Sequence, residues 1–175
     1  PQIHTSSFLV EIFFQTASGQ TDAGLVQKIN EAGWVLGVNQ AGGVTLAATS
    51  GGDTRWLASA AVINDGQWHH VIAEADRKAG RFALYVDGKR DAAGPGLGPD
   101  ASLANEADLC VGGAPNGHYL KGAIDFLRIA RGTSVASTEG NARPAASASR
   151  ADAVRRMRRQ STWRGRSTRS FSSVI

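Results

Sequence analysis

The sequence predicts an all-β protein in which two antiparallel sheets pack against each other, and three observations support this. Up to about Gly132, short segments recur in which apolar residues occupy every second position, as strands with one buried face require. Clusters rich in Gly, Asn and Asp separate these segments, and the chain contains 21 glycines, which suits many tight turns. No helical period occurs over the same stretch, so short strands at regular spacing favour a sandwich or a barrel.

The strands of the first half follow from alternation and turn residues. The segment FLVEIFFQT at 8–16 places Phe8, Val10, Ile12 and Phe14 on one face, so this strand is expected to have one side in a core. Further strands are predicted at 24–30, at 55–63 and, as a hairpin around a turn at 39–43, within 34–50.

The second half opens with a predicted central hairpin at 65–90, DGQWHHVIAEADRKAGRFALYVDGKR. WHHVIAEA and RFALYVDGKR each alternate apolar and polar residues, and DRKAG joins them as a turn. A loop dense in Gly and Pro is expected at 92–101, followed by a short strand at 107–113.

The last clear strand is predicted at 123–132, AIDFLRIARG. Strict alternation would place Ile124, Phe126 and Arg128 on one face of it. After Ser137 the strand pattern stops abruptly, which also motivates the hypothesis of a frame shift or fusion at this point. Translating the coding DNA in the other two frames would test that hypothesis.

Charge divides the chain in the same region. Residues 1–140 contain 10 Lys and Arg against 14 Asp and Glu, a net charge of −4, whereas residues 141–175 contain 9 Arg and one Asp, a net charge of +8. We therefore predict one domain at 1–136 and an Arg/Ser-rich tail of low order at 137–175, in which ADAVRRMRRQ could form a short helix. No nucleic-acid-binding motif accompanies the basic tail, so no nucleic acid partner is expected.

Composition leaves the compartment open. No apolar run approaches the roughly 20 residues that span a bilayer, and PQIHTSS has no features of a signal peptide. Cys110 is the single cysteine, which excludes an internal disulfide but fits both cytoplasmic proteins and disulfide-free secreted domains. In the apolar context LCVGG it is expected to pack as a small hydrophobic residue.

Four motifs stand in a recognisable order: FLVEIFFQT, then DGQWHHV with LYVDGKR, then LCVGG, then GAIDFLRIARG. In these motifs the chain resembles the laminin-G-like, concanavalin A-like jelly-roll family over roughly Phe8 to Gly132. The resemblance implies a two-sheet antiparallel jelly roll that is secreted or displayed at a cell surface. Most such modules bind glycans or extracellular proteins. PQIHTSS is too short to supply the family's usual strand before Phe8, so an incomplete sandwich with an exposed strand edge is expected.

The adjacent histidines His69 and His70 have two interpretations. They could be metal ligands or acid/base groups, or they could be structural. Neighbours on a strand point to opposite faces, so one ion cannot easily take both, and no third ligand lies at zinc-site spacing. The structural interpretation is therefore favoured, with one histidine packed against the core and hydrogen-bonded to the backbone.

Glycoside hydrolysis is the enzymatic alternative, because some glycosidases share this sandwich. It needs two carboxylates on one face, and related enzymes carry them as E-x-D-x-E. Here Glu74 and Asp76, and likewise Glu106 and Asp108, form E-x-D without the final Glu. Glu74 and Asp76 are also expected at the hairpin turn, where carboxylates are usually solvated. No catalytic residues are therefore assigned, and the protein is predicted not to be an enzyme.

Calcium is the one cofactor that the resemblance suggests. Asp125 occupies the family's Ile-Asp position, which in related sandwiches helps to bind a structural Ca²⁺ or holds a neighbouring loop. Ca²⁺ needs six to eight oxygen ligands, and the short N-terminus would supply few carbonyls. Both interpretations of Asp125, a calcium ligand and a loop cap, remain open.

A glycan site needs aromatic faces for stacking and polar groups for hydroxyls. The loop candidates are Trp56, Asn116, His118 and Tyr119, with PNGHYLKG the most informative segment. The alternative is that Tyr119 folds back onto the core edge. The sequence thus predicts a non-catalytic, carbohydrate-binding module. A protein-interaction, adhesion or structural accessory domain is the first alternative, and a glycoside hydrolase is less favoured.

Overall fold

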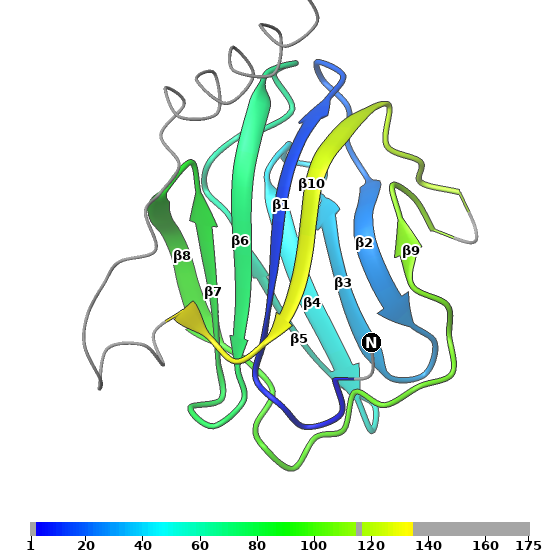
Figure 1. Ribbon diagram of the computed structural model, residues 1–175, viewed down its shortest axis with the longest axis vertical. Helices are drawn as coiled ribbons and strands as arrows, with labels where there is room; N and C mark the ends of the chain where they lie inside the picture. The colour runs from blue at the N-terminus through cyan, green and yellow to red at the C-terminus, as the bar shows by residue number, and fades with distance from the viewer. Residues whose placement is uncertain (1–2, 115–116, 135–175) are drawn as a thin grey trace, which may run out of the picture. The chain divides into compact units, whose positions relative to one another are not determined.

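The computed structural model describes residues 3–114 and 117–134, and it shows two five-stranded antiparallel sheets packed face to face (Figure 1). Its strands are β1 (Phe8–Thr16), β2 (Ala23–Ile29), β3 (Gly33–Val38), β4 (Val44–Ser50), β5 (Asp53–Ala58), β6 (Trp68–Asp76), β7 (Arg81–Val86), β8 (Lys89–Pro95), β9 (Cys110–Val111) and β10 (Gly122–Arg131). Sheet A has the order β10-β1-β6-β7-β8 and sheet B the order β5-β4-β3-β2-β9. The predicted two-sheet antiparallel sandwich is confirmed.

The core lies between the two sheets and comes from the alternating positions of both. In β1 the four predicted inward residues, Phe8, Val10, Ile12 and Phe14, are fully buried. Across the core the Phe8 ring meets Trp34 of sheet B, with ring centroids 5.5 Å apart. The first and last described strands are neighbours, since β1 pairs with β10 on one side and with β6 on the other. The alternation read from the sequence therefore fixes which face of each sheet is inside.

Strand lengths differ from the prediction at the ends of both sheets. β5 ends at Ala58 rather than Ile63, although Ile63 is still buried in the core from the loop that follows. β8 reaches Pro95, within the predicted loop. Pro95 has no N–H to donate, and β8 is an edge strand, where such a residue is tolerated. β9 is only two residues long.

In β10 the predicted face is wrong for Ile124, because of a β-bulge, whereas Phe126 and Arg128 lie opposite Leu127 and Ile129 as predicted. Phe13 pairs with Phe126 but the next residue, Phe14, pairs with Ile124, so Asp125 is an extra residue that shifts the alternation. Ile124 thereby packs against the core together with Leu127 and Ile129. Phe126 instead lies 44% exposed.

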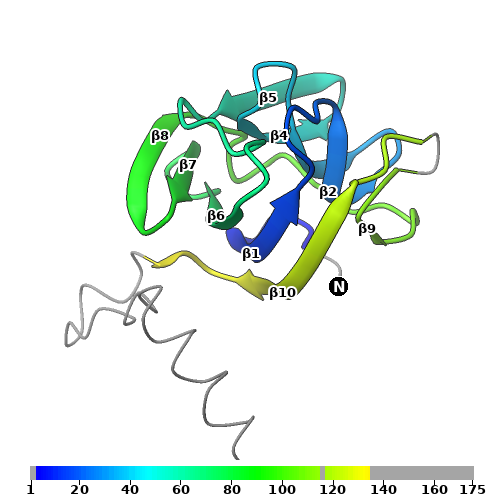
Figure 2. The same cartoon turned by 90° about the horizontal axis from the view of Figure 1, so that it is seen from above.

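Sheet A ends at β10, and among the described residues no strand pairs with the outer side of β10. Sheet B continues farther with β2 and β9, which lie beyond β10 in both views (Figures 1 and 2). Within residues 3–114 and 117–134 this side of β10 is a sheet edge, and the exposure of that edge stays a prediction. The predicted domain end at 136 and the tail at 137–175, including its helix, lie outside the described residues. In the described part, no helix has the length and apolarity to cross a membrane.

Candidate functional site

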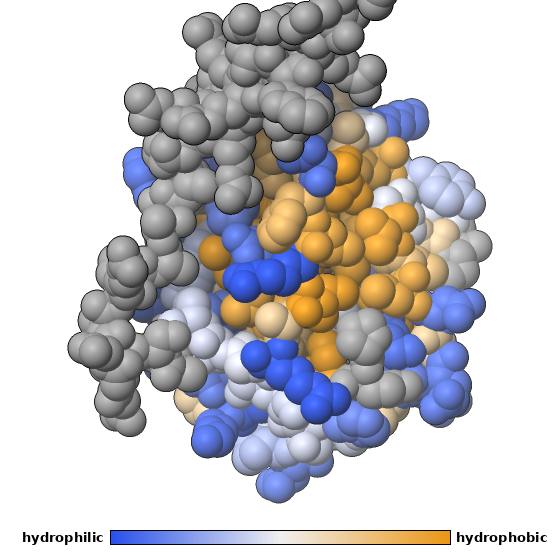
Figure 3. Space-filling model, in the orientation of Figure 1, coloured by the Kyte–Doolittle hydropathy of each residue, from blue (hydrophilic) through white to orange (hydrophobic). Residues whose placement is uncertain are grey.

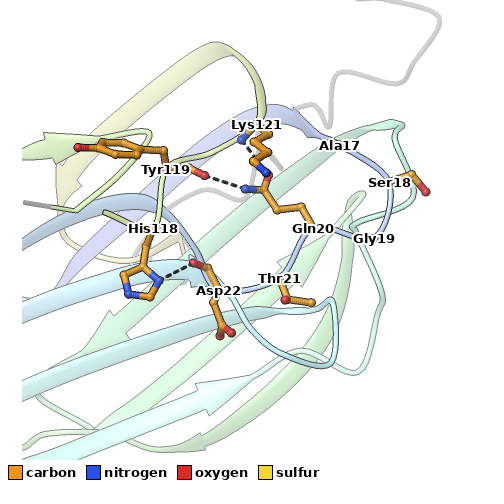
Figure 4. A pocket seen from close by; sticks show the side chains of 9 residues that line it. All are labelled: Ala17, Ser18, Gly19, Gln20, Thr21, Asp22, His118, Tyr119 and Lys121. Carbon is orange, nitrogen blue, oxygen red and sulfur yellow. Dashed lines mark hydrogen bonds between the residues drawn. The ribbon is translucent and has the colours of Figure 1, made fainter. Parts of the chain in front are cut away.

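One end of the sandwich carries a pocket of about 520 Å³ between two loops. One loop joins β1 to β2, and the other precedes β10. The loops contribute Ala17, Ser18, Gly19, Gln20, Thr21 and Asp22, and His118, Tyr119 and Lys121 (Figure 4). Two of the residues predicted to bind a glycan, His118 and Tyr119, therefore line the same pocket.

The Gln20 side chain ties the two loops together. Its Nε2 donates to the Tyr119 carbonyl at 2.7 Å, and its Oε1 accepts from the Lys121 N–H at 2.8 Å (Figure 4). The backbone adds a bond from the Ala17 N–H to the Lys121 carbonyl at 2.6 Å. Because the amide nitrogen and the amide oxygen of Gln20 both bond to the backbone of the other loop, this side chain holds the two walls of the pocket together. Sequence reasoning missed Gln20, since its partners lie about a hundred positions away.

Asp22 and His118 meet at the inner corner of the pocket with unusual backbone conformations. Their φ angles are 52° and 56°, a left-handed region that non-glycine residues adopt at a cost of about 1 kcal/mol or more. His118 Nδ1 donates to the Asp22 carbonyl at 3.0 Å, and the His118 carbonyl accepts from the Gly24 N–H at 2.8 Å. The Asp22 carboxylate accepts no hydrogen bond from any described residue.

A shallow groove of about 330 Å³ continues from this corner along the outer face of sheet B. It shares Asp22 and His118 with the pocket. The other residues that form it are mostly small: Ala23, Gly24, Gln27, Val35, Gly37, Val38, Thr45, Ala47 and Ala114. Small side chains at outward positions of three adjacent strands leave room for a ligand to approach the sheet.

Trp56 stands beside this groove. Its β5 position pairs with Ala47 of β4, so its side chain lies on the same outer face as Ala47. The indole is 67% exposed. The structure thus places Trp56 and His118 along one surface, while Tyr119, 68% exposed, belongs to the adjoining pocket. Asn116 lies outside the described residues.

Asp125, the predicted calcium ligand, is the bulged residue of β10 and is exposed. No described residue donates a hydrogen bond to the Asp125 carboxylate. A loop that Asp125 could cap is therefore not identified among the described residues. The described residues also contain no group of three or more His, Cys, Asp or Glu side chains that could hold a metal ion. A calcium ligand set for Asp125 would therefore depend on carbonyls and water.

The two histidines of β6 point to opposite faces, as predicted. His70 Nε2 lies 2.9 Å from Glu11, whose other oxygen accepts from Arg128 at 2.7 and 2.8 Å. His69, with a side chain 12% exposed, lies with Nδ1 2.9 Å from Asp87 and Nε2 3.0 Å from Asp65. The sequence predicts that one of these histidine rings hydrogen-bonds to the backbone. In the structure both rings lie against carboxylates instead. Since both ring nitrogens of His69 face acceptors, the imidazolium form fits best.

The His69 cluster predicts a stability change with pH. Burial lowers the pKa of His69, but hydrogen bonds to Asp65 and Asp87 outweigh it and raise the pKa above its ordinary value. The ion pair therefore stabilises the fold fully below about pH 6.5 and is lost as pH rises through the folded-state pKa. Urea unfolding should show the wild type losing about 1 kcal/mol more than His69→Gln on going from pH 6 to pH 9. Equal losses in both proteins would contradict this.

Glu74 does not lie in the solvated turn where it was expected. It is 3% exposed within β6, and its Oε1 accepts from the Ser134 N–H at 2.6 Å. Burial and the charge of Glu74 raise the pKa of Tyr85. Glu106 and Asp108 are exposed and precede β9 outside any strand. The Glu106–Asp108 pair therefore lacks the strand placement of a glycosidase site.

Comparisons with known proteins agree with this architecture. The human adhesion G protein-coupled receptor D2 is 40% identical over 86 residues, which cover 44% of this chain and only 9% of the receptor. Domains LG4-5 of the mouse laminin alpha1 chain superpose with a TM-score of 0.61 at 17% identity, covering 71% of this chain and 35% of that one.

A carbohydrate-binding module is also similar. The CBM40 module of the Ruminococcus gnavus IT-sialidase, bound to alpha2,3 sialyllactose, gives a TM-score of 0.58 at 18% identity, covering 71% of this chain and 75% of that one. At such identities the likeness shows the fold. A sequence model of the concanavalin A-like lectin/glucanases superfamily matches residues 1–138, most of the chain, and the chain therefore belongs to this superfamily.

Proposed function

We propose that this domain is a non-catalytic carbohydrate-binding module whose ligand lies in the groove on sheet B between Trp56 and His118. The observation that carries the proposal is a 67% exposed indole beside a groove of small residues. An exposed indole offers a broad apolar face with a polar N–H at its edge, and a sugar ring presents an apolar face that can stack on it.

Polar groups around the groove suit sugar hydroxyls. The Asp22 carboxylate is available as an acceptor, and Gln27 and Thr45 line the same surface. Because His118 Nδ1 donates to the Asp22 carbonyl, Nε2 of the neutral ring is left as an acceptor. A sugar stacked on Trp56 would thus meet hydrogen-bonding groups at the far end of the groove, and the pocket with Tyr119 could take a further residue of the glycan.

The superfamily and the CBM40 neighbour support a glycan as ligand, and the adhesion receptor and laminin relatives support a place outside the cell or at its surface. We include a structural Ca²⁺ at Asp125 in the proposal. A glycan array probed with and without Ca²⁺ tests both statements. If no glycan binds either with or without Ca²⁺, the lectin function is overturned.

Trp56→Ala is expected to weaken binding of any glycan found in this way about tenfold, because the stacking surface is lost. Isothermal titration calorimetry would measure the change in Kd. Trp68→Ala is the matched control, since Trp68 is 41% exposed on the outer face of the other sheet. Equal losses in both variants would place the ligand elsewhere.

An enzymatic function is tested separately. Reducing-sugar release from a panel of β-glucans should stay at background with the purified protein. Release that disappears in Glu74→Gln or Glu106→Gln would show a glycoside hydrolase and contradict the non-catalytic function.

A further inference from the structure

We propose that His69 is a positioning residue for the pocket, and that its protonation controls the β1–β2 loop at 17–22, which forms one wall. His69 is not among the described residues that line the pocket, and Asp65 carries its effect to the loop. The inference concerns the pocket of the proposed glycan-binding module, and its effect on affinity rests on that function. The effect on the loop itself needs no ligand.

The imidazole of His69 lies between two carboxylates from different connections. Its Nε2 is 3.0 Å from Asp65 in the β5–β6 connection, and its Nδ1 is 2.9 Å from Asp87 in the turn between β7 and β8. Among the described residues, these two carboxylates are the charged groups that act on the ring. Only the imidazolium carries a proton on each nitrogen, so only the charged ring donates to both carboxylates at once.

Asp87 is held more firmly than Asp65. The His70 N–H donates to the Asp87 carboxylate at 2.9 Å, and the Asp87 N–H donates to the His70 carbonyl at 2.8 Å. The Asp65 carboxylate accepts from the Gln67 N–H, at 2.8 Å, within its own connection. A neutral His69 ring keeps one proton, which we expect on Nδ1, facing Asp87. Its Nε2 then turns a lone pair toward the Asp65 carboxylate, and the repulsion displaces Asp65.

The two neighbours of this aspartate are bonded to the β1–β2 loop and to the end of β1. The Asn64 carbonyl accepts from the Gly19 N–H at 2.7 Å, and Asn64 Nδ2 donates to the Gln20 carbonyl at 2.9 Å. Gln15 Nε2 donates to the Gly66 carbonyl. A displacement of the aspartate therefore moves the loop as well.

Gln20 is the residue through which these bonds reach the pocket. Its carbonyl accepts from Asn64, while its side chain bonds to the Tyr119 carbonyl and the Lys121 N–H in the opposite wall (Figure 4). A shift of the Gln20 backbone therefore changes how the two walls are held together. The charged form of His69 holds the walls in the observed arrangement, and the neutral form loosens them.

The pH range follows from the same contacts. Burial lowers the pKa of His69, but the hydrogen bonds to Asp65 and Asp87 outweigh it and raise the pKa above its ordinary value of about 6.5. The ring is thus charged at pH 6 and loses its proton as the pH rises toward 9. A glycan that needs the held pocket should bind about fivefold more weakly at pH 9, the low end of couplings measured between two sites.

Methyl groups in the loop can report its position without a ligand. Ala17 and Thr21 each carry one, and methyl signals remain visible at pH 9, where exposed amide protons exchange rapidly. In ¹³C-labelled protein, both methyl signals should shift between pH 6 and pH 9 with the same pKa as the His69 ring carbons. His69→Gln should abolish the shift. His70→Gln is the matched control and should keep it, because His70 meets Glu11 on the outer face of sheet A, the face turned toward the reader in Figure 3.

Asp65→Asn separates movement of the loop from a direct effect of the His69 charge on the signals. His69 still titrates beside Asp87 in this variant, but an amide can turn its oxygen to the charged ring and its NH₂ to the neutral one. The methyl shifts should therefore shrink in Asp65→Asn. The role of His69 is overturned if the shifts do not follow its titration, if they persist in His69→Gln, or if they are unchanged in Asp65→Asn.

The glycan array, probed at pH 6 and pH 9, tests the effect on affinity. Wild-type protein should bind its glycans more weakly at pH 9, whereas His69→Gln should show a smaller difference. An equal difference in both proteins would overturn the effect on affinity. If no glycan binds at either pH, the glycan-binding function is overturned together with that effect, while the methyl titration still supports or overturns the role of His69 in the loop.

Discussion

Replacing Arg77 with Met is expected to lower the free energy of unfolding by about 3 kcal/mol, and the midpoint of thermal unfolding by about 10 °C. The side chain is 1% exposed, although it lies in the connection between β6 and β7. Its guanidinium donates to the carbonyls of Leu97, Gly98 and Ala101, which belong to the long segment between β8 and β9.

Methionine can fill the volume of Arg77 but cannot donate to these carbonyls. Burial lowers the pKa of Arg77, yet an arginine stays charged at neutral pH, so three acceptors lose a charged donor together. The cost is offset in part because the charge no longer has to be buried. Arg81→Met is the control, because Arg81 is exposed at the start of β7 and should change stability by less than about 0.5 kcal/mol. Equal stability of both variants would show that Arg77 does not hold this segment.

Alternation and turn residues were sufficient to predict most of sheet A. The pairing of Trp68–Asp76 with Arg81–Val86 is local, with a short turn that contains Gly80 at a φ of 61°. The bulge in β10 could not be predicted in the same way. It depends on how β10 meets β1, more than a hundred residues earlier, and nothing in AIDFLRIARG itself marks Asp125 as the extra residue.

The candidate site could also be predicted from the sequence only in part, because it too depends on contacts between distant residues. The residue types of Trp56 and His118 predict a glycan site, and the structure places both along one groove. That groove depends on the register of Ala47 against Trp56 and on small residues at outward positions of neighbouring strands. Small residues at alternate positions, such as Gly37, were a usable signal in the sequence. The contribution of Gln20 was not, because its role arises only where the first and last loops meet.

Gly122 is the first residue of β10 and follows directly on the second of these loops. Gly122→Ala is expected to destabilise the domain by about 3 kcal/mol and to disturb the pocket at the same time. A Cβ at Gly122 would overlap the carbonyl oxygen of Gln15 and press on Thr16. These are backbone atoms of β1, which cannot move without breaking the pairing of β1 with β10.

The neighbouring residue transmits the disturbance to the pocket. The Lys121 carbonyl accepts from the Ala17 N–H, and its own N–H donates to Gln20, so displacing the start of β10 pulls on both loops. Gly98→Ala is the matched control, because no atom outside Gly98 and its two chain neighbours lies within 4 Å of a Cβ placed there. Urea unfolding should show the loss only for Gly122→Ala, and its amide spectrum should change at residues 17–22. A Gly122→Ala protein as stable as Gly98→Ala would mean that β1 and β10 can separate here without cost, and that the close contact between their backbones does not hold the pocket loops in place.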